Sequence, residues 1–187
     1  MSKFIGYTGR VGVGKSSVLK ELARLIPLDI IDSDKIVEEL YASGNMEIAT
    51  KLGVPILTKA EVKKTIKCAD DLKRVTNVFA PYINAEIQKQ RNTAKHGTII
   101  LDAPLLFEFD LHLICDYSVN IYVSSPEIAF LRATTRKNPM SPELFDKISK
   151  AQMSDIERNK LATYRVLNDG AVSDAVKEIM NIIAKER

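Results

Sequence analysis

The chain has 187 residues, of which 45% are hydrophobic and 27% are charged, and its net charge of +3 is small. This length suits one α/β domain, and the composition is that of an ordinary soluble globular protein. The weak positive charge disfavours a dedicated nucleic-acid binder, and no stretch approaches the ~18 apolar residues that a membrane span needs. Because no signal peptide precedes the first predicted strand, we expect a cytoplasmic protein, and a monomer with an oligomer left open.

Apolar and polar residues alternate along the chain in a way that predicts strands separated by helices. The expected strands are Phe4–Tyr7, Leu28–Ile31, Thr98–Leu101, Tyr117–Val123 and Arg165–Asn168. The expected helices are Ser16–Ile26, Asp34–Tyr41, Pro126–Arg136, Pro142–Ala162 and Ala171–Lys185. This order favours a parallel five-stranded sheet with helices on both faces, which is a three-layer α/β/α fold.

The stretch from Ser43 to His96 contains no convincing strand and has polar helical patterns instead. Residues 70–95 could form one long helix, which Pro81 is expected to interrupt because proline lacks an amide donor. We therefore predict a helical region inserted into the α/β core.

A phosphate-binding motif lies between the first predicted strand and the first predicted helix. Its residues are Gly9-Arg10-Val11-Gly12-Val13-Gly14-Lys15-Ser16, which match G-x-x-x-x-G-K-[ST]. Glycines let backbone amides approach phosphate oxygens, and the helix N-terminus favours an anion. Lys15 is expected to reach the β- and γ-phosphates of ATP, and Ser16 to hold Mg²⁺. The strand-loop-helix context argues against a chance match, but the motif alone does not separate kinases from ATPases or GTPases.

Two aspartates, Asp32 and Asp34, follow the second predicted strand. In a doubly wound sheet, residues just past the carboxyl end of a strand line the ligand crevice. One carboxylate there could accept a hydroxyl proton while the other orients Mg²⁺ or its waters. The alternative is an N-cap aspartate with a solvated partner, because aspartate is common at helix starts. The residues alone leave both interpretations open.

The third predicted strand ends at Asp102, a position that resembles the metal-supporting aspartate of a Walker B strand. An unusual apolar run follows, Ala103-Pro104-Leu105-Leu106-Phe107-Glu108. It lies where strand and crevice should meet, so it could pack against a phosphate acceptor, with Glu108 binding the acceptor or orienting a basic group. A tight turn with core leucines and an exposed glutamate is the alternative.

Several arginines surround a predicted break between helices. Arg132 and Arg136 lie one helical turn apart and are expected to share a face, and Arg158 follows on the next predicted helix. Arginines around a mobile segment can close over phosphates and stabilise the charge of a transition state. For any one of them, a solvated helix face is about as consistent with the sequence.

Together these residues resemble the dephospho-coenzyme A kinases, which phosphorylate the ribose 3′-hydroxyl of dephospho-coenzyme A with ATP. The resemblance extends over nearly the whole chain. Its matching segments are Thr8–Ser17, Ile31–Asp34, Phe79–Ile83, Pro104–Glu108, Ala151-Gln152 and Asn168-Asp169-Gly170. The phosphate loop is generic, whereas the acidic pair, the P-L-L-F-E block and the late A-Q…N-x-G block, in this order, are specific to the family.

The resemblance implies a single α/β/α P-loop kinase domain over residues 1–187, with a helical acceptor-binding region and a lid. The core would comprise residues 1–42, 97–136 and 163–187, the acceptor-binding region about 43–96, and the lid about 137–162. Implied partners are ATP, Mg²⁺ and dephospho-coenzyme A, without nucleic acid or membrane.

The resemblance also implies roles for individual residues. Asp34 would be the catalytic base, with Lys15 and the lid arginine Arg136 also catalytic. The implied ATP-binding residues are Gly9, Gly12, Val13, Gly14, Lys15, Ser16, Ser17 and Asn168, the last of them near the adenine. The implied acceptor-binding residues are Asp32, Asp34, Pro104, Leu105, Glu108 and Arg132. Ser16 and Asp102 would hold the metal.

Three positions depart from the family pattern. Arg10 stands where the family usually has glycine or a small residue, Ala80 replaces a histidine before Pro81, and Thr163 replaces an acidic residue. We expect the Arg10 side chain to point out of the phosphate cradle. Two other functions stay open: another small P-loop kinase acting on a nucleoside, nucleotide or small alcohol, and a non-catalytic nucleotide-binding regulator.

Overall fold

The computed structural model describes residues 2–186, apart from the side chains of Ala69 and Leu72. The chain divides into two compact units, one of residues 1–30 and 95–187 and the other of residues 31–94. We call them the phosphate unit and the helical unit. Their boundary falls within one strand of the sheet.

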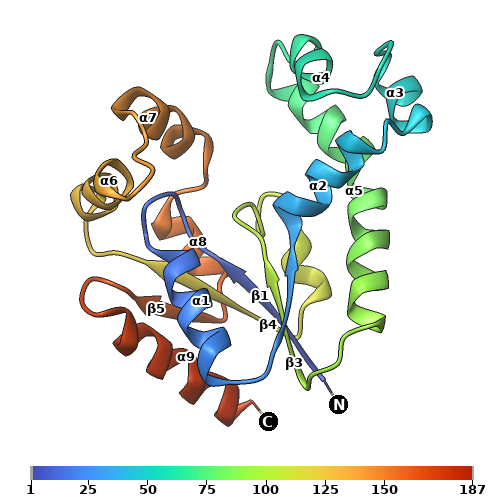
Figure 1. Ribbon diagram of the computed structural model, residues 1–187. Coiled ribbons are helices and arrows are strands. Elements are labelled where there is room, and N and C mark those ends of the chain that lie inside the picture. The colour runs from blue at the N-terminus through green and yellow to red at the C-terminus, as the bar shows by residue number, and fades with distance from the viewer. Residues whose placement is uncertain (1, 187) are drawn as a thin grey trace. The chain divides into compact units, whose positions relative to one another are not determined.

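Five strands form one sheet in the order β2-β3-β1-β4-β5 (Figure 1). Their bounds are Lys3–Thr8 for β1, Asp29–Asp32 for β2, Thr98–Asp102 for β3, Tyr117–Tyr122 for β4 and Tyr164–Leu167 for β5. β1 pairs in parallel with β3 and with β4, and β4 pairs in parallel with β5. The expected strands and the expected five-stranded sheet are thereby confirmed.

The register of the central strands brings distant residues to one edge of the sheet. Tyr7 of β1 lies opposite Asp102 of β3, and Thr8 lies opposite Asn120 of β4. Because the strands are parallel, the segments that follow Thr8 and Asp102 leave the sheet at the same edge.

Helices cover the sheet of the phosphate unit. Helix α1, Lys15–Leu25, packs against α9, Val172–Lys185, on one face, and α8, Asp155–Leu161, contacts β4 (Figure 1). The core between α1, α9 and the sheet is almost entirely apolar. Its most buried members include Ile5, Val18, Leu22, Ile121, Val166, Val176 and Ile179. This arrangement confirms the expected three-layer α/β/α fold.

The predicted helix over residues 142–162 is wrong in one respect, because the segment forms two helices. Helix α7 covers Pro142–Ala151, and α8 begins at Asp155. Ser154 caps α8 in a capping box with Glu157, a local arrangement that begins a new helix and so favours a break before it. Helix α6 covers Pro126–Thr135, and a short 3₁₀ helix at Leu111–Ile114 was not predicted.

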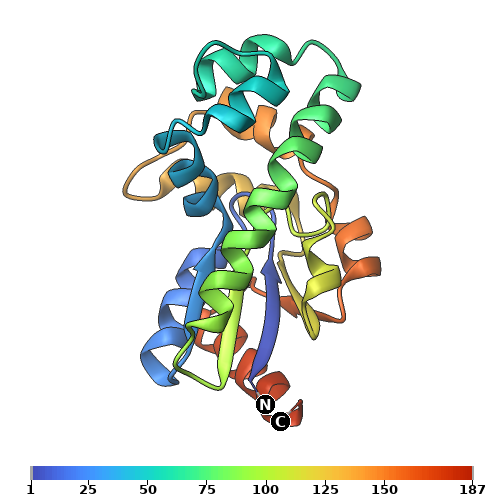
Figure 2. The same cartoon turned by 90° about the vertical axis from the view of Figure 1, so that its right-hand side faces the viewer.

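After β2, the described residues of the helical unit form helices and no further strand, as predicted. They are α2, Ser33–Ala42, α3, Met46–Leu52, α4, Lys59–Thr65, and α5, Ala69–Asn92. The expected interruption at Pro81 is wrong, since α5 continues through it as one unbroken helix (Figure 2). Proline removes the bond to the carbonyl of Asn77, and because Asn77 is exposed, water can bind that carbonyl instead.

None of the helices in the described part of the chain is both long enough and apolar enough to cross a membrane.

Candidate active site

The phosphate-binding loop joins β1 to α1 and depends on two glycines with left-handed backbone. Gly12 has φ 82° and Gly14 has φ 88°, a region that side chains disfavour. A Cβ atom at Gly12 would lie 2.1 Å from the carbonyl oxygen of Ala129, and one at Gly14 would lie 2.5 Å from the Nδ2 atom of Asn168. The loop is thus closely packed on both sides. No side-chain hydrogen bond caps the N-terminus of α1, an arrangement that suits the binding of an anion there.

Lys15, the first residue of α1, forms an ion pair with Asp102 at the end of β3. Their side chains are 11% and 14% exposed, so water screens this pair only in part. The hydroxyl of Tyr7 donates to the carbonyl oxygen of Lys15 at 2.9 Å, and burial together with Asp102 raises the pKa of Tyr7 well above its usual value. Tyr7 therefore stays a neutral donor that holds the backbone of Lys15 in place.

Asn168, just past β5, lies against the phosphate-binding loop. Its Nδ2 atom donates to the carbonyl oxygen of Val13 at 2.8 Å, and its side chain is buried. Arg132 of α6 binds the same region, with bonds of 2.5 Å to the carbonyl oxygen of Asn168 and 2.9 Å to that of Asp169. The structure thus brings Asn168 to the nucleotide loop. The expected role of Arg132 in binding the acceptor stays a prediction.

Arg136 has different surroundings from Arg132. Helix α6 ends at Thr135, and Arg136 is its C-cap, with extended backbone. Its exposed side chain donates from Nε to the carbonyl oxygen of Asn138 at 2.8 Å. The two arginines therefore do not act as a matched pair on one helix face, and the lid role of Arg136 stays a prediction.

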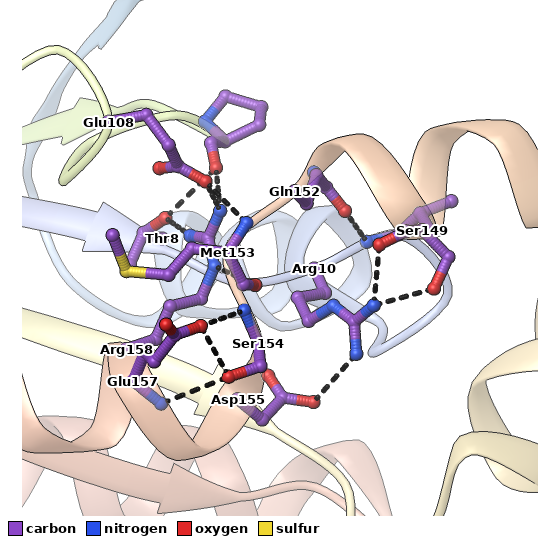
Figure 3. Close-up of polar contacts among 12 residues, drawn as sticks. Thr8, Arg10, Glu108, Ser149, Gln152, Met153, Ser154, Asp155, Glu157 and Arg158 are labelled. Carbon is purple, nitrogen blue, oxygen red and sulfur yellow. Dashed lines mark hydrogen bonds and ion pairs between the residues drawn. The ribbon is translucent and has the colours of Figure 1, made fainter.

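Arg158 of α8 is completely buried, which the sequence interpretation of a lid arginine did not anticipate. Its guanidinium donates to the Thr8 hydroxyl at 2.8 Å, the Pro104 carbonyl oxygen at 2.9 Å and Glu108 Oε1 at 2.5 Å (Figure 3). Its Nε atom donates to the carbonyl oxygen of Met153 at 3.1 Å. Burial lowers the pKa of Arg158, and Glu108 and then Asp155 oppose that shift.

Glu108 accepts two bonds at one oxygen, from Arg158 and from the amide of Met153 at 2.9 Å. Of the two roles considered for Glu108, orientation of a basic group is therefore observed. Leu106 and Phe107 are buried, whereas Pro104 and Leu105 are half-buried. Contacts of Pro104, Leu105 and Glu108 with an acceptor remain predictions. The sequence analysis named a basic group as one of two alternatives for the partner of Glu108, but nothing in the sequence identified that group as Arg158.

Asp32 and Asp34 lie in the helical unit at the start of α2. Asp32 is the N-cap, and its Oδ1 atom accepts from the amides of Asp34 at 3.0 Å and Lys35 at 3.1 Å. Both aspartate side chains are exposed. The capping interpretation of Asp32 is thus observed, while the acceptor role of Asp32 and the catalytic role of Asp34 stay predictions.

The predicted metal ligands are a hydroxyl and a carboxylate, the hard oxygen donors that suit Mg²⁺. Ser16 is exposed in the first turn of α1, and Asp102 lies beside Lys15. No cluster of three or more histidine, cysteine or acidic residues able to hold a metal occurs among residues 2–186 as described. Such a donor set fits an ion held largely by nucleotide phosphates and water, as in P-loop enzymes, better than an all-protein metal cage.

The strand-loop-helix junction, Lys15 and the parallel sheet define a P-loop nucleotide-binding protein. The sequence profile of the family described as "Dephospho-CoA kinase" matches residues 3–174. The chain belongs to the dephospho-CoA kinase family. This assignment confirms the resemblance seen in the sequence and the expected class of enzyme, an ATP-dependent kinase of coenzyme A biosynthesis.

Individual relatives agree with the family assignment. A dephospho-CoA kinase from Lactobacillus johnsonii is 28% identical, over 98% of this chain and 98% of its own length. One from Mannheimia succiniciproducens is 30% identical, over 90% of this chain and 82% of its own. The crystal structure of TT1252 from Thermus thermophilus has a TM-score of 0.82 at 22% identity and covers 98% of this chain and 97% of its own. At that identity the structural likeness shows the fold alone.

Proposed function

We propose that this protein transfers the γ-phosphoryl group of ATP to the ribose 3′-hydroxyl of dephospho-coenzyme A, giving coenzyme A and ADP. The observation that carries the proposal is the phosphate-binding loop, whose Lys15 is held at the carboxyl edge of the sheet by Asp102 and Tyr7. The family assignment supplies the acceptor.

ATP phosphates would lie in the loop from Gly9 to Ser16, against the uncapped amides of α1. Lys15 would exchange its ion pair with Asp102 for the β- and γ-phosphates, because a phosphate group carries more negative charge than one carboxylate. Asn168 would position the nucleotide through its bond to Val13. Mg²⁺, when bound at Ser16 and Asp102, would neutralise charge on the phosphates.

Asp34 would accept the proton of the ribose hydroxyl as the phosphoryl group is transferred. Its exposed position at the start of α2 leaves the carboxyl group accessible to a substrate, and Asp32 holds its backbone amide. Arg136, which is also exposed, would stabilise charge on the transferring group. Pro104, Leu105, Glu108 and Arg132 are proposed to bind the acceptor, directly or through the loop that carries them. We also propose a cytoplasmic location and a monomeric state, and sedimentation analysis can test the monomeric state.

The reaction is tested by offering the protein ATP, Mg²⁺ and one acceptor at a time, with ADP release measured by a coupled assay. We expect dephospho-coenzyme A to exceed nucleosides, nucleoside monophosphates and small alcohols by at least about 10³-fold in kcat/KM, because a site built for hydrogen-bonding groups discriminates strongly. Phosphorus NMR of the product should place the new phosphate on the 3′-oxygen. A better nucleoside or alcohol acceptor would support the other small-kinase hypothesis, and tight ATP binding without any transfer would support the regulator.

A further inference from the structure

Arg10, the second residue of the phosphate-binding loop, reaches toward α7 and the start of α8 (Figure 3). One terminal nitrogen donates to the carbonyl oxygen of Ser149 at 2.7 Å and to its hydroxyl at 2.6 Å. The other lies 3.8 Å from Asp155 Oδ2. The side chain therefore points out of the phosphate cradle, as expected, and ends in three contacts that lie outside the motif.

The next residue of the loop is held by the same segment. The amide of Val11 donates to the side-chain oxygen of Gln152 at 2.9 Å (Figure 3). A Cβ atom on the preceding Gly9 would lie 2.7 Å from the carbonyl oxygen of Ile121, so the loop starts in close contact with β4. Arg10 and Val11 are thus held by contacts from outside the loop, and Gly9 lies close against β4.

The loop has little hydrogen bonding of its own to hold this shape. Between Gly9 and Gly14, the described backbone forms one internal hydrogen bond, from the amide of Val13 to the carbonyl oxygen of Arg10. This bond is long, at 3.4 Å. Glycines make such a loop flexible, and ordering it opposes nucleotide binding unless other contacts order it first. Asn168 supplies such a contact for Val13, while Arg10 and Gln152 supply them for the opposite end.

The charge of Arg10 is balanced by its surroundings. Burial raises the pKa of Asp155, while the positive charges of Arg10 and then Arg158 lower it. With Glu108 on Arg158, two arginines and two carboxylates form a compact group of balanced charge. The two terminal nitrogens of Arg10 are therefore engaged by the hydrogen bonds to Ser149 and the ion pair with Asp155, which hold the side chain away from the phosphate cradle.

We propose that Arg10 is a positioning residue for ATP, which anchors the start of the phosphate-binding loop to residues 149–155 before the nucleotide binds. This proposal rests on one part of the proposed function, namely that this loop binds the phosphates of ATP. Its consequence is that ATP affinity depends on a side chain at a position where the family usually has a small residue.

The test is a calorimetric titration of the full-length protein with Mg²⁺ and a non-hydrolysable ATP analogue, without any acceptor. Arg10→Ala is expected to weaken binding roughly tenfold, because the loop must then be ordered at the expense of binding energy. Arg10→Lys should weaken it less, roughly threefold, because one ammonium can replace only part of a guanidinium fork. Gln152→Ala removes the bond to Val11 without changing the loop sequence and should also weaken binding roughly threefold.

The matched control is Arg24→Ala, which removes an arginine of α1 whose side chain is 72% exposed and pairs only with nearby Glu21 among the described ion pairs. Its affinity should equal that of the wild type. Urea unfolding of each variant, measured alongside, separates anchoring from general stability. A folded Arg10→Ala protein with wild-type affinity overturns the proposal, even if its stability falls. If Arg10→Ala does not fold, Arg10→Met takes its place, because methionine keeps an apolar stem without the guanidinium, and wild-type affinity in that folded variant overturns the proposal equally. A wild-type protein that fails to bind the analogue would instead contradict the proposed function.

Discussion

The phosphate-binding loop and the start of α2 both carry residues predicted to act on substrate, but their surroundings differ. Around the loop, polar side chains are buried and bonded to distant segments, as Arg158 and Asn168 show. At the start of α2, Asp32 and Asp34 are exposed, and Asp32 bonds to its own helix. The difference teaches that a binding site for phosphates can be built from tertiary contacts, while a base needs an accessible carboxyl group.

The same contrast extends to the ion pairs of the two units. In the phosphate unit, Arg158 and Glu108 pair with side chains 0% and 21% exposed. In the helical unit, Lys51 and Glu47 pair within α3 with side chains 50% and 64% exposed. Burial removes water from the first pair, so its loss should matter far more than the loss of the second.

The largest expected effect comes from Asp34→Asn, which tests whether the exposed acidic segment supplies the base. We expect kcat to fall by about 10²–10⁴-fold, because the variant cannot accept the hydroxyl proton. Affinity for ATP, measured by calorimetry, should change little. Turnover near the wild-type rate would remove Asp34 from that role. Asp110→Asn, at an exposed turn position of the phosphate unit, is a suitable control.

Arg158→Met tests the buried network. It leaves the half-buried Glu108 without its cation and removes the buried guanidinium bonds, and we expect the free energy of unfolding in urea to fall by about 3 kcal/mol. The double variant with Glu108→Gln should recover part of this loss, because the uncompensated charge is gone. Equal stability of the single variant and the wild type would show that the network is not a source of stability.

Lys15→Ala tests the phosphate-binding loop itself. Removing the ammonium group should lower kcat/KM for ATP by about 10²–10³-fold, because its interaction with transferring charge is lost. The fold should persist, which circular dichroism can check, although Asp102 loses its partner. An unchanged rate would be incompatible with the proposed use of this loop.

The smallest expected effect comes from Lys51→Ala in the helical unit. The hydrogen bond from Lys51 lowers the pKa of Glu47, yet both groups are solvated and their attraction is screened. We expect no resolvable change in the urea midpoint of unfolding. A loss of unfolding free energy comparable to that of Arg158→Met would contradict the difference that we infer between the ion pairs of the two units.

Much of the fold follows from local sequence pattern. The strands, the phosphate-binding loop and most helices were predicted within a few residues, because apolar periodicity and glycine chemistry act over short distances. The errors have local causes of their own. Helix α5 accommodates Pro81 because the carbonyl that loses its hydrogen bond belongs to the exposed Asn77. Residues 142–162 form two helices because Ser154 caps the second of them.

The sequence by itself determined the family, the fold and the presence of a nucleotide loop with a candidate base and metal ligands. Tertiary structure alone decided which arginines serve the loop and how. Arg158 proved buried, Arg132 binds backbone near Asn168, and Arg10 binds Ser149, which lies 139 residues further along the chain. The physical reason is that the sequence does not show whether an arginine is solvated or buried. Only the groups that surround its guanidinium in the folded protein distinguish the two cases.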